Sequence, residues 1–177
     1  TEEDEMSRRS GELRLAKLLA ERGIASRRAA EDIIREGRVS VNGEVVDTPA
    51  CVVDPHKDDV RLDGRNLPRA PERVYYLLYK PRGCITGRDD PQGRKSIFDV
   101  VGDLGTRVEP VGRLDYDTEG ALLLTNDGDL ANRLMHPSSD VPKRYLAKVY
   151  RVPDDRDLEA IAKGVFLEDG RTKRAKV

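Results

Sequence analysis

The stretch Val39-Ser-Val-Asn-Gly-Glu-Val-Val46 restricts the possible fold more than any other part of the chain. Asn-Gly between alternating valines is a strong hairpin signal, because a type I′ turn needs two residues that tolerate positive φ. Two helical patterns precede it: leucines recur at helical spacing up to Gly23, and Ser26 is a suitable N-cap for a helix over 27–36. Short strands bounded by turn residues are expected after the hairpin, at 51–53 and 60–62. Residues 12–66 therefore predict a small domain of two helices packed on a small sheet.

The composition changes after a proline-containing linker at 67–72, and the remainder predicts a second, mixed domain over 73–177. Runs of apolar and β-branched residues predict strands at 74–79, 84–86, 108–111, 121–125, 145–150 and 165–167. Helical patterns are expected at 96–101, 129–135 and 154–163. The fold class is thus α+β with mostly antiparallel strands, and no closing element follows the last predicted turn. The polar, acidic residues 1–11 are expected to be disordered.

Composition argues against several classes of protein. Of the 177 residues 37% are charged, and the longest apolar run, Val74–Tyr79, is far shorter than the roughly 20 residues that a membrane-spanning helix needs. The acidic start has no apolar stretch behind it, so no secretory signal is expected. Cys51 and Cys84 form no Cys-x-x-Cys pair, which argues against a disulfide framework or a cysteine-based zinc site. These features favour a cytoplasmic protein that does not contact a membrane. We expect it to be a monomer.

Basic residues are concentrated in two short segments, although the net charge is only −1. Residues 13–40 hold seven basic and four acidic residues, and residues 143–151 hold four basic residues and no acidic one. Guanidinium and ammonium groups on one helix face can bind backbone phosphates, and the regular shape of A-form RNA suits such a face. The alternative is a solvated helix surface without a ligand.

Three blocks in the first segment keep the order and spacing of a known RNA-binding domain. They are Leu-x-x-Leu-Leu at 15–19, Gly-Ile-Ala-Ser-Arg-Arg-x-Ala-Glu at 23–31 and Gly-Arg-Val-x-Val-Asn-Gly at 37–43. Residues 12–62 closely resemble the small RNA-binding domain named after ribosomal protein S4. The resemblance implies RNA contacts from one face of the helix pair and from the loop after it, made by Arg14, Lys17, Ser26, Arg27, Arg28 and Arg38.

A second motif, Gly112-Arg-Leu-Asp-Tyr-Asp-Thr-Glu-Gly120, holds three carboxylates at alternate positions and is bounded by glycines. One interpretation is a calcium loop, whose first, third, fifth and sixth positions would be Asp115, Asp117, Glu119 and Gly120. Its twelfth position would be Asn126, where such a loop needs a bidentate glutamate. Two other interpretations are a single nucleophilic carboxylate on a glycine-bounded turn, and a plain surface turn.

The motif continues into Ala-Leu-Leu-Leu-Thr-Asn-Asp-Gly-Asp-Leu130, and the stretch as far as Pro137 resembles the signature of one enzyme family. These are the bacterial ribosomal RNA pseudouridine synthases of the RsuA/RluB branch. Lys80-Pro-Arg-Gly83 and Lys143-Arg-Tyr145 are similar to further blocks of that family, which also carries an S4-like domain in front. The resemblance implies isomerisation of a uridine to pseudouridine, with the target base flipped out of its stack. Because the reaction neither gains nor loses an atom, no cofactor and no metal are implied.

The resemblance also implies roles for individual residues. Asp115 matches the catalytic carboxylate, which could attack the ribose or remove a proton from the neighbouring carbon. Tyr145 matches the aromatic residue that stacks on the target base. Arg113, beside the aspartate, is expected to neutralise a phosphate or to hold the loop. Lys80 and Arg82 are expected to contact phosphates, and the alternative for each of these cations is an ordinary surface position.

The family's catalytic domain continues into further strands, which carry a basic partner for the catalytic aspartate. The site is therefore expected to be incomplete in this chain, and a carboxylate without that partner would lose control of its pKa. A second hypothesis follows, a non-catalytic RNA-binding or ribosome-assembly factor. Under the enzyme hypothesis the partner is ribosomal RNA, of the large subunit rather than the small one, or an assembly intermediate. Asp115→Ala would separate the hypotheses, because it should abolish activity and leave RNA binding intact.

Overall fold

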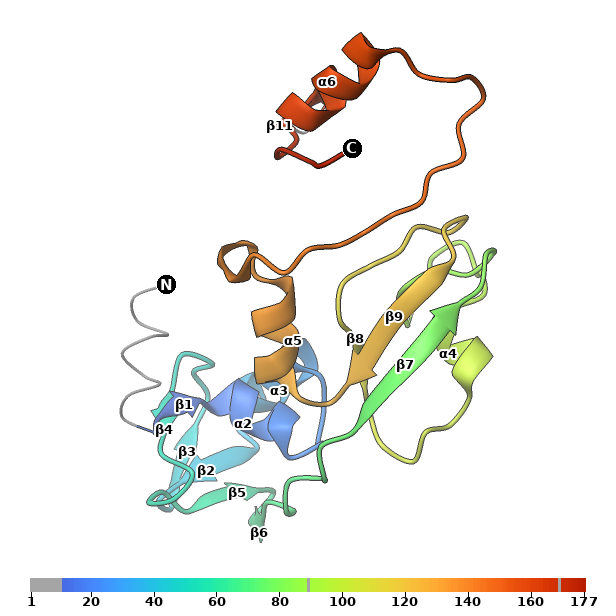
Figure 1. Cartoon of the computed structure of the whole chain (residues 1–177). Coiled ribbons are helices and arrows are strands. Elements are labelled where there is room, and N and C mark those ends of the chain that lie inside the picture. The colour runs from blue at the N-terminus through green and yellow to red at the C-terminus, as the bar shows by residue number, and fades with distance from the viewer. Residues whose placement is uncertain (1–10, 89, 169) are drawn as a thin grey trace. The chain divides into compact units, whose positions relative to one another are not determined.

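The computed structural model describes residues 11–88, 90–168 and 170–177 (Figure 1). Except for Gly11, the predicted disordered tail over 1–11 lies outside the described residues. The chain divides into two compact units, Thr1–Val141 and Pro142–Val177. The predicted domain boundary at 67–72 falls inside the first unit and stays a prediction. Within the described ranges, no helix is both long enough and apolar enough to cross a membrane.

The predicted helix pair is present in the first unit. α2 (Leu15–Glu21) and α3 (Arg27–Arg35) contact each other and form one hydrophobic core with the adjacent strands. The hydroxyl of Ser26 accepts a hydrogen bond of 3.2 Å from the backbone N–H of Ala29, which confirms Ser26 as the N-cap of α3. The side chains that both helices bury are apolar, as the helical spacing predicted: Leu15, Leu18, Leu19, Ala30 and Ile34.

The predicted hairpin lies in a four-stranded antiparallel sheet of order β3-β2-β5-β6. Asn42 and Gly43, with φ values of 53° and 89°, join β2 (Val39–Val41) to β3 (Glu44–Val46), as a type I′ turn requires. β5 (Val60–Leu62) pairs with β2 on its other side, and β6 (Arg65–Asn66) pairs with β5. The predicted strand at 51–53 is β4 (Val52–Val53), and it pairs with β1 (Leu13–Arg14). The leucine spacing predicts a helix that includes the residues of β1, and for Leu13 and Arg14 this prediction is wrong.

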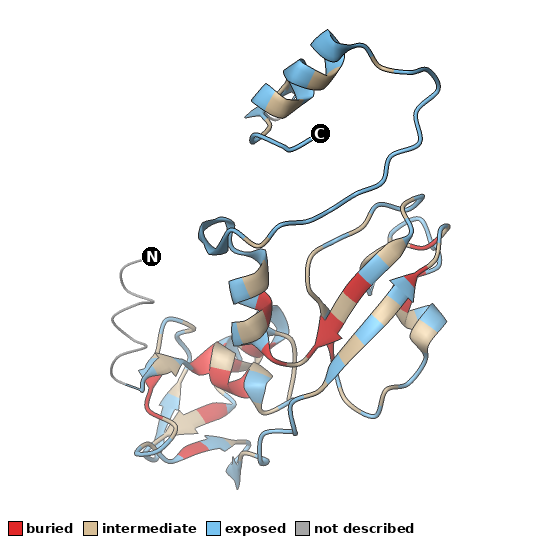
Figure 2. Cartoon of the chain, in the orientation of Figure 1, coloured by how far each residue is buried: buried red, intermediate tan, exposed pale blue. Residues whose placement is uncertain are grey.

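A three-stranded antiparallel sheet of order β7-β9-β8 organises the remainder of the first unit (Figure 1). β7 (Tyr75–Lys80) pairs along its whole length with β9 (Gly120–Thr125), and β8 (Glu109–Pro110) pairs with the other edge of β9. One face of the sheet packs on a second core, which contains Ile97, Val108, Leu122 and Leu124. On the opposite face, β7 exposes Tyr75, Leu77 and Tyr79 (Figure 2). The side chains of β7 therefore alternate between the core and the surface.

Helices with good N-caps flank this sheet. α4 (Ile97–Val101) begins with a capping box formed by Ser96 and Asp99, and α5 (Gly128–Met135) begins at Asp127. The one-turn helix η1 (Pro137–Ser139) follows α5. The strand expected at 84–86 is reduced to an isolated bridge between Ile85 and Ser96.

The residues just before β7 are tied to the end of β9. The amide of Asn126 accepts a hydrogen bond from the N–H of Val74 (2.9 Å) and donates one to the carbonyl of Glu72 (2.7 Å). The next carboxylate, Asp127, accepts hydrogen bonds from Arg73 (2.9 Å) and from the hydroxyl of Tyr75 (3.0 Å). Two side chains therefore fix four consecutive residues, 72–75, to the β9–α5 turn.

The second unit contains α6 (Asp155–Lys163) and a short hairpin of β10 (Phe166–Leu167) and β11 (Gly170–Arg171). The prediction of a strand at 145–150 is wrong, because this segment adopts no regular structure and its apolar side chains are exposed (Figure 2). A strand needs a neighbour that satisfies its N–H and C=O groups. No strand among the described residues pairs with this segment.

Candidate active site

The carboxylate Asp115 lies on the loop that connects β8 to β9. The loop begins at Gly112, whose φ is 86°, and ends at Gly120, whose φ is 141°. Both values lie in the region that favours glycine, which explains the glycines at the two ends of the motif. Within the loop, the carbonyl of Asp115 accepts a hydrogen bond from the N–H of Thr118 (3.0 Å), which closes a tight turn around the aspartate.

A buried lysine holds this turn from inside the protein. Lys80, the last residue of β7, has no exposed surface, and its Nζ donates to the carbonyls of Asp115 (2.9 Å), Thr118 (2.9 Å) and Pro81 (3.1 Å). A weaker contact reaches the carbonyl of Tyr116 at 3.4 Å. Buried charges persist in proteins when polar atoms surround them, and here those atoms are carbonyls of the Asp115 turn. The expected phosphate contact at Lys80 is therefore corrected to a structural role.

A second layer of hydrogen bonds joins the Asp115 loop to the segment after β7. The hydroxyl of Thr86 donates to the carbonyl of Leu114 (2.7 Å) and accepts from its N–H (3.1 Å). The N–H of Gly83 donates to the carbonyl of Tyr116 (2.9 Å), and the Nε of Arg82 donates to the carbonyl of Asp117 (2.8 Å). The backbone on both sides of Asp115 is thus held by atoms from 80–86. Preorganised backbone of this kind is what a catalytic group needs.

The side chain of Asp115 itself takes part in none of these contacts. The residue is exposed, and no described residue donates a hydrogen bond to its carboxylate. Arg113 is also exposed and, within the described part of the chain, its guanidinium pairs with no carboxylate. The loop therefore presents the carboxylate of Asp115 and the guanidinium of Arg113, two residues apart and both without an ion pair among the described residues, on a fixed backbone. Asp117 and Glu119 are exposed on the same loop.

The structure contradicts the calcium interpretation of the same motif. The second half of the twelve-residue segment is β9, in which Ala121 to Thr125 are paired with β7 along the ladder. A calcium loop must fold its later positions back around the ion, and a ladder-bound strand cannot do so.

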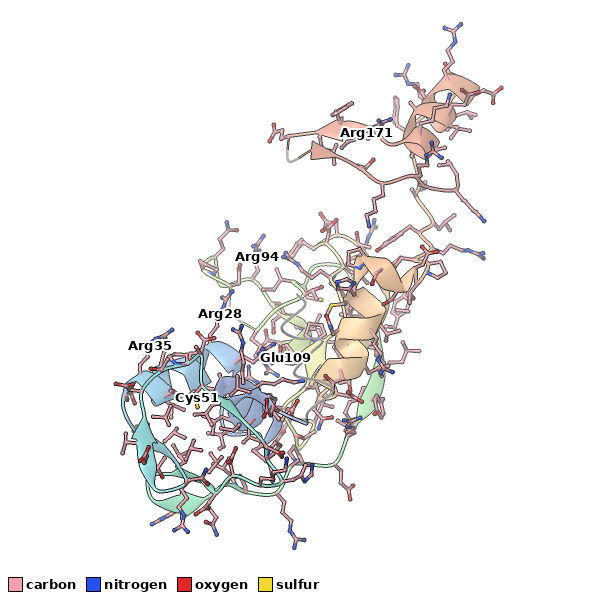
Figure 3. The ribbon with its side chains drawn as sticks, turned by 90° about the vertical axis from the view of Figure 1, so that its left-hand side faces the viewer. Arg28, Arg35, Cys51, Arg94, Glu109 and Arg171 are labelled. Atoms are coloured by element: carbon pink, nitrogen blue, oxygen red, sulfur yellow. The ribbon has the colours of Figure 1, made fainter. Side chains whose placement is uncertain are left out.

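The cations expected to bind RNA at the helix pair fall into two groups. Arg14, Arg27 and Arg28 are exposed, and their side chains form no ion pair within the described ranges; Arg28 is labelled in Figure 3. Lys17, by contrast, pairs with Asp129 (3.0 Å) and Glu21 (3.4 Å). Arg38 forms a fork with Asp63 through its Nε (3.0 Å) and one terminal nitrogen (2.7 Å). The hydrogen bonds of this fork raise the pKa of Arg38 and lower the pKa of Asp63.

Tyr145 lies in the second unit, and 64% of its surface is exposed. It belongs to the segment without regular structure, so no strand fixes its direction. The structure thus brings Lys80, Arg82 and Arg113 together around Asp115, and it describes Tyr145 as part of a separate unit.

Comparison with known proteins gives this loop its context. The sequence profile of a family described as RNA pseudouridylate synthase matches residues 74–175, which is more than half of the chain and includes the Asp115 loop. The chain belongs to this family. A profile of the S4 domain matches residues 13–60, which include both helices and the hairpin. The fold class and the family expected from the sequence are therefore confirmed.

Individual relatives agree with this assignment. The chain is 48% identical over 163 residues to "Ribosomal large subunit pseudouridine synthase B" of Bacillus subtilis, a match that covers 92% of this chain and 66% of that protein. It is 50% identical over 165 residues to an "Uncharacterized RNA pseudouridine synthase" of Aquifex aeolicus, covering 92% of this chain and 65% of the other. A solved structure, "Crystal structure of pseudouridylate synthase", matches with a TM-score of 0.51 at 30% identity and covers 93% of this chain and 71% of that one. The chain spans about two thirds of the length of the two relatives.

Sequence reasoning missed two contacts that hold the Asp115 loop, those of Lys80 and Thr86. The buried position of Lys80 could have been predicted from strand alternation. Lys80 lies two and four residues after Leu78 and Tyr76, so its side chain is on the same face of the strand, and that face packs on the core. The contact of Thr86 with Leu114 had no signal in the sequence. The two residues are 28 positions apart, and a lone threonine beside a glycine is unremarkable.

Proposed function

We propose that this chain isomerises a uridine of large-subunit ribosomal RNA to pseudouridine, with Asp115 as the catalytic carboxylate. One observation carries the proposal: Asp115 is exposed on a turn whose carbonyls are bonded to the buried ammonium of Lys80. A fixed backbone beneath a free carboxylate positions one reactive group while leaving room for a nucleotide. The names of the relatives support ribosomal RNA, and the large subunit in particular, as the substrate.

The reaction needs a carboxylate and little else from the protein. The bond between N1 of uracil and C1′ of ribose breaks, the base rotates, and C5 of uracil bonds to C1′. The proton on C5 is lost to solvent, and N1 gains one. Asp115 either forms a transient bond to the ribose or removes a proton from the carbon next to C1′, and each route uses one ionised carboxylate. The substrate and the product are isomers, because the proton lost from C5 is matched by the proton gained at N1. No electron is transferred to or from another molecule.

The remaining roles follow from the chemistry of the substrate. The uridine has to leave its stack to reach Asp115, and an aromatic ring such as Tyr145 can stack on the exposed base. Arg113, exposed beside Asp115, suits a phosphate of the same strand. Arg82 holds the carbonyl of Asp117 and extends toward solvent, so we assign it both a structural contact and a phosphate contact.

The S4-like region, for which we propose the bounds 12–66, gives a second RNA contact through Arg14, Arg27 and Arg28. We assign Lys17 and Arg38 to the same surface. Phosphates of the RNA would replace the carboxylates with which these two side chains are paired in the free protein. Ser26 contributes to this RNA contact as the N-cap of α3, which begins at Arg27. After the linker at 67–72, the catalytic region follows. Two contacts on one chain bind more tightly than either alone when both can engage the same RNA.

Tritium release tests the proposal directly. Large-subunit ribosomal RNA labelled with tritium at C5 of uracil is incubated with the chain, as free transcript and as assembled subunits. The Bacillus subtilis relative, assayed in parallel, shows that the labelled RNA is a competent substrate. We expect release by the protein extended to the full length of that relative, and a rate reduced at least about 1000-fold there by Asp115→Asn. The 177 residues alone are expected to release less, because their site is expected to be incomplete.

The matched control is Asp117→Asn, which neutralises a second exposed carboxylate on the same loop and should keep most of the activity. Equal loss in both variants would remove the special role of Asp115. Release by the relative and none by the extended protein, on either form of the RNA, would contradict the proposed activity. Release only after the extension would show that residues beyond the 177 complete the site.

A further inference from the structure

We propose that Arg94 is a further RNA contact of the catalytic loop, which binds a backbone phosphate of a nucleotide next to the target uridine. The inference extends the proposed function and rests on RNA being the ligand of the Asp115 loop. Arg94 lies in the segment between β7 and α4, whose Asp-Asp-Pro-Gln-Gly-Arg-Lys sequence has no assigned role. Figure 3 labels its side chain.

The guanidinium of Arg94 is held in one orientation before any ligand arrives. Its Nε and one terminal nitrogen contact the two carboxylate oxygens of Asp90 at 3.0 and 2.8 Å, and its backbone N–H adds a third hydrogen bond of 2.8 Å. The side chain of Asp90 is only 6% exposed, whereas that of Arg94 is 42% exposed. The buried carboxylate thus orients a fork whose remaining N–H groups are available to solvent.

The ion pair persists over the pH range in which such an enzyme works. The hydrogen bonds from Arg94 hold the pKa of Asp90 at about 2, so the carboxylate is ionised at neutral pH. An arginine is always charged under the same conditions. The orientation of Arg94 therefore does not change with pH near neutrality, because Asp90 stays ionised there.

The location of Arg94 links it to the reacting carboxylate. Its guanidinium carbon lies 5.7 Å from the centre of the Tyr116 ring, and Tyr116 is the residue directly after Asp115. The two loops are also joined through their backbones, because Ile85 is bonded to the carbonyl of Lys95 (2.9 Å) while Thr86 is bonded to Leu114. Arg94 and Asp115 thus belong to one connected piece of structure.

The chemistry of the ligand favours a phosphate at this position. An RNA strand brings a phosphate with every nucleotide, and a uridine placed against the Asp115 carboxylate brings its neighbours' negative charges to the same loop. A guanidinium with free N–H groups beside an aromatic ring can bind such a phosphate in a forked geometry. Arg88 shows the contrast, because its guanidinium stacks at 3.9 Å on Phe98 and is also bonded to Val108 and Glu109.

The test measures RNA binding and its salt dependence in the Asp115→Asn background, where no turnover occurs. The probe is a transcript of large-subunit ribosomal RNA. Arg94→Ala and Arg94→Gln should each weaken binding roughly 3- to 10-fold near 0.1 M salt and lower the salt slope by about 0.7 to 0.9. Arg94→Lys should keep the slope and lose part of the affinity, because it keeps the charge without the fork.

Arg107→Ala is the matched control. Arg107 lies in the same unit, is 44% exposed and is also paired with a carboxylate, that of Glu109 at 3.0 Å. It should leave the affinity within about twofold and the slope unchanged. An unchanged slope in the Arg94 variants, or an equal loss in Arg107→Ala, would overturn the proposal.

A second measurement uses the unmodified chain, so it does not depend on the folding of any variant. Phenylglyoxal modifies accessible arginines, and mass spectrometry reports each site. The RNA transcript should protect Arg94 and leave Arg107 reactive; equal reactivity of Arg94 with and without RNA contradicts the contact. The two proposals fail in distinguishable ways. If only the proposed function is wrong, tritium is not released, but Arg94→Ala still weakens RNA binding more than Arg107→Ala does.

Discussion

The exposed arginines of the helix pair and the two cations Lys80 and Arg82, which hold the Asp115 loop, are used in opposite ways. On the helix pair, Arg14, Arg27 and Arg28 are exposed and form no ion pair within the described ranges. At the loop, Lys80 is buried among carbonyl oxygens and Arg82 is bonded to a backbone carbonyl. The first set can meet a ligand without breaking any contact of the protein. The second set builds the surface on which a ligand would lie.

The difference shows that a basic residue in a recognised motif has two possible uses, and that its environment decides between them. A cation that is exposed and forms no ion pair with the protein can bind a phosphate directly. Its loss should lower RNA affinity and leave the free energy of unfolding unchanged. A structural cation has exchanged water for protein acceptors, so its loss should lower stability first. Substitutions at matched positions can separate the two uses.

Lys80→Met should have the largest effect on stability. The substitution removes the buried ammonium and leaves several carbonyls of the Asp115 turn without a donor, which should lower the free energy of unfolding by about 3 kcal/mol or more. Urea unfolding followed by circular dichroism measures it. Arg82→Met is the control, because it removes one exposed hydrogen bond and should cost less than about 1 kcal/mol. Equal losses in the two variants would show that burial does not distinguish them.

Ser26→Ala should have an intermediate effect. The hydroxyl caps α3, and loss of an N-cap typically lowers the free energy of unfolding by about 1 kcal/mol. Ser26→Asp keeps a capping oxygen and should restore that stability. It also places a negative charge beside Arg27, so it should weaken binding of the RNA transcript. Unchanged RNA binding in Ser26→Asp would argue that this end of α3 does not face phosphates.

Arg27→Ala and Arg28→Ala should have the smallest effect on stability, within about 0.5 kcal/mol. Each should nevertheless lower the slope of RNA affinity against salt by about 0.7 to 0.9. Arg35→Ala is the control on the same helix, because Arg35 is exposed and paired with Asp32 (2.8 Å) and Glu31 (3.3 Å). If Arg35→Ala changes the slope as much as the other two, the effect is one of net charge, and no specific face is involved.

The sequence predicted those features that depend on residues close together in the chain. The turn at Asn42-Gly43, the cap at Ser26 and the helix periodicities are local, because each follows from the φ values or side chains of a few neighbours. The family was also identifiable, because the Asp115 motif is continuous. The strand expected at 145–150 depended on a partner elsewhere, and the carbonyls that accept from Lys80 include those of Asp115 and Thr118, which lie on the loop before β9. Properties of this second kind arise only when distant segments meet.

Under the proposed function, the attachment of residues 72–75 to the β9–α5 turn has a consequence for how RNA would be selected. Asn126 and Asp127 fasten the end of the connecting segment, so the length of free chain between β6 and this anchor is only a few residues. A short connection limits how far apart two ligand contacts can be and raises the effective concentration of the second once the first has formed. The short connection would let both regions bind one RNA only when the target uridine lies at a suitable distance from an RNA helix. Discrimination among ribosomal sites would then come from spacing in the folded RNA, which neither contact reads by itself.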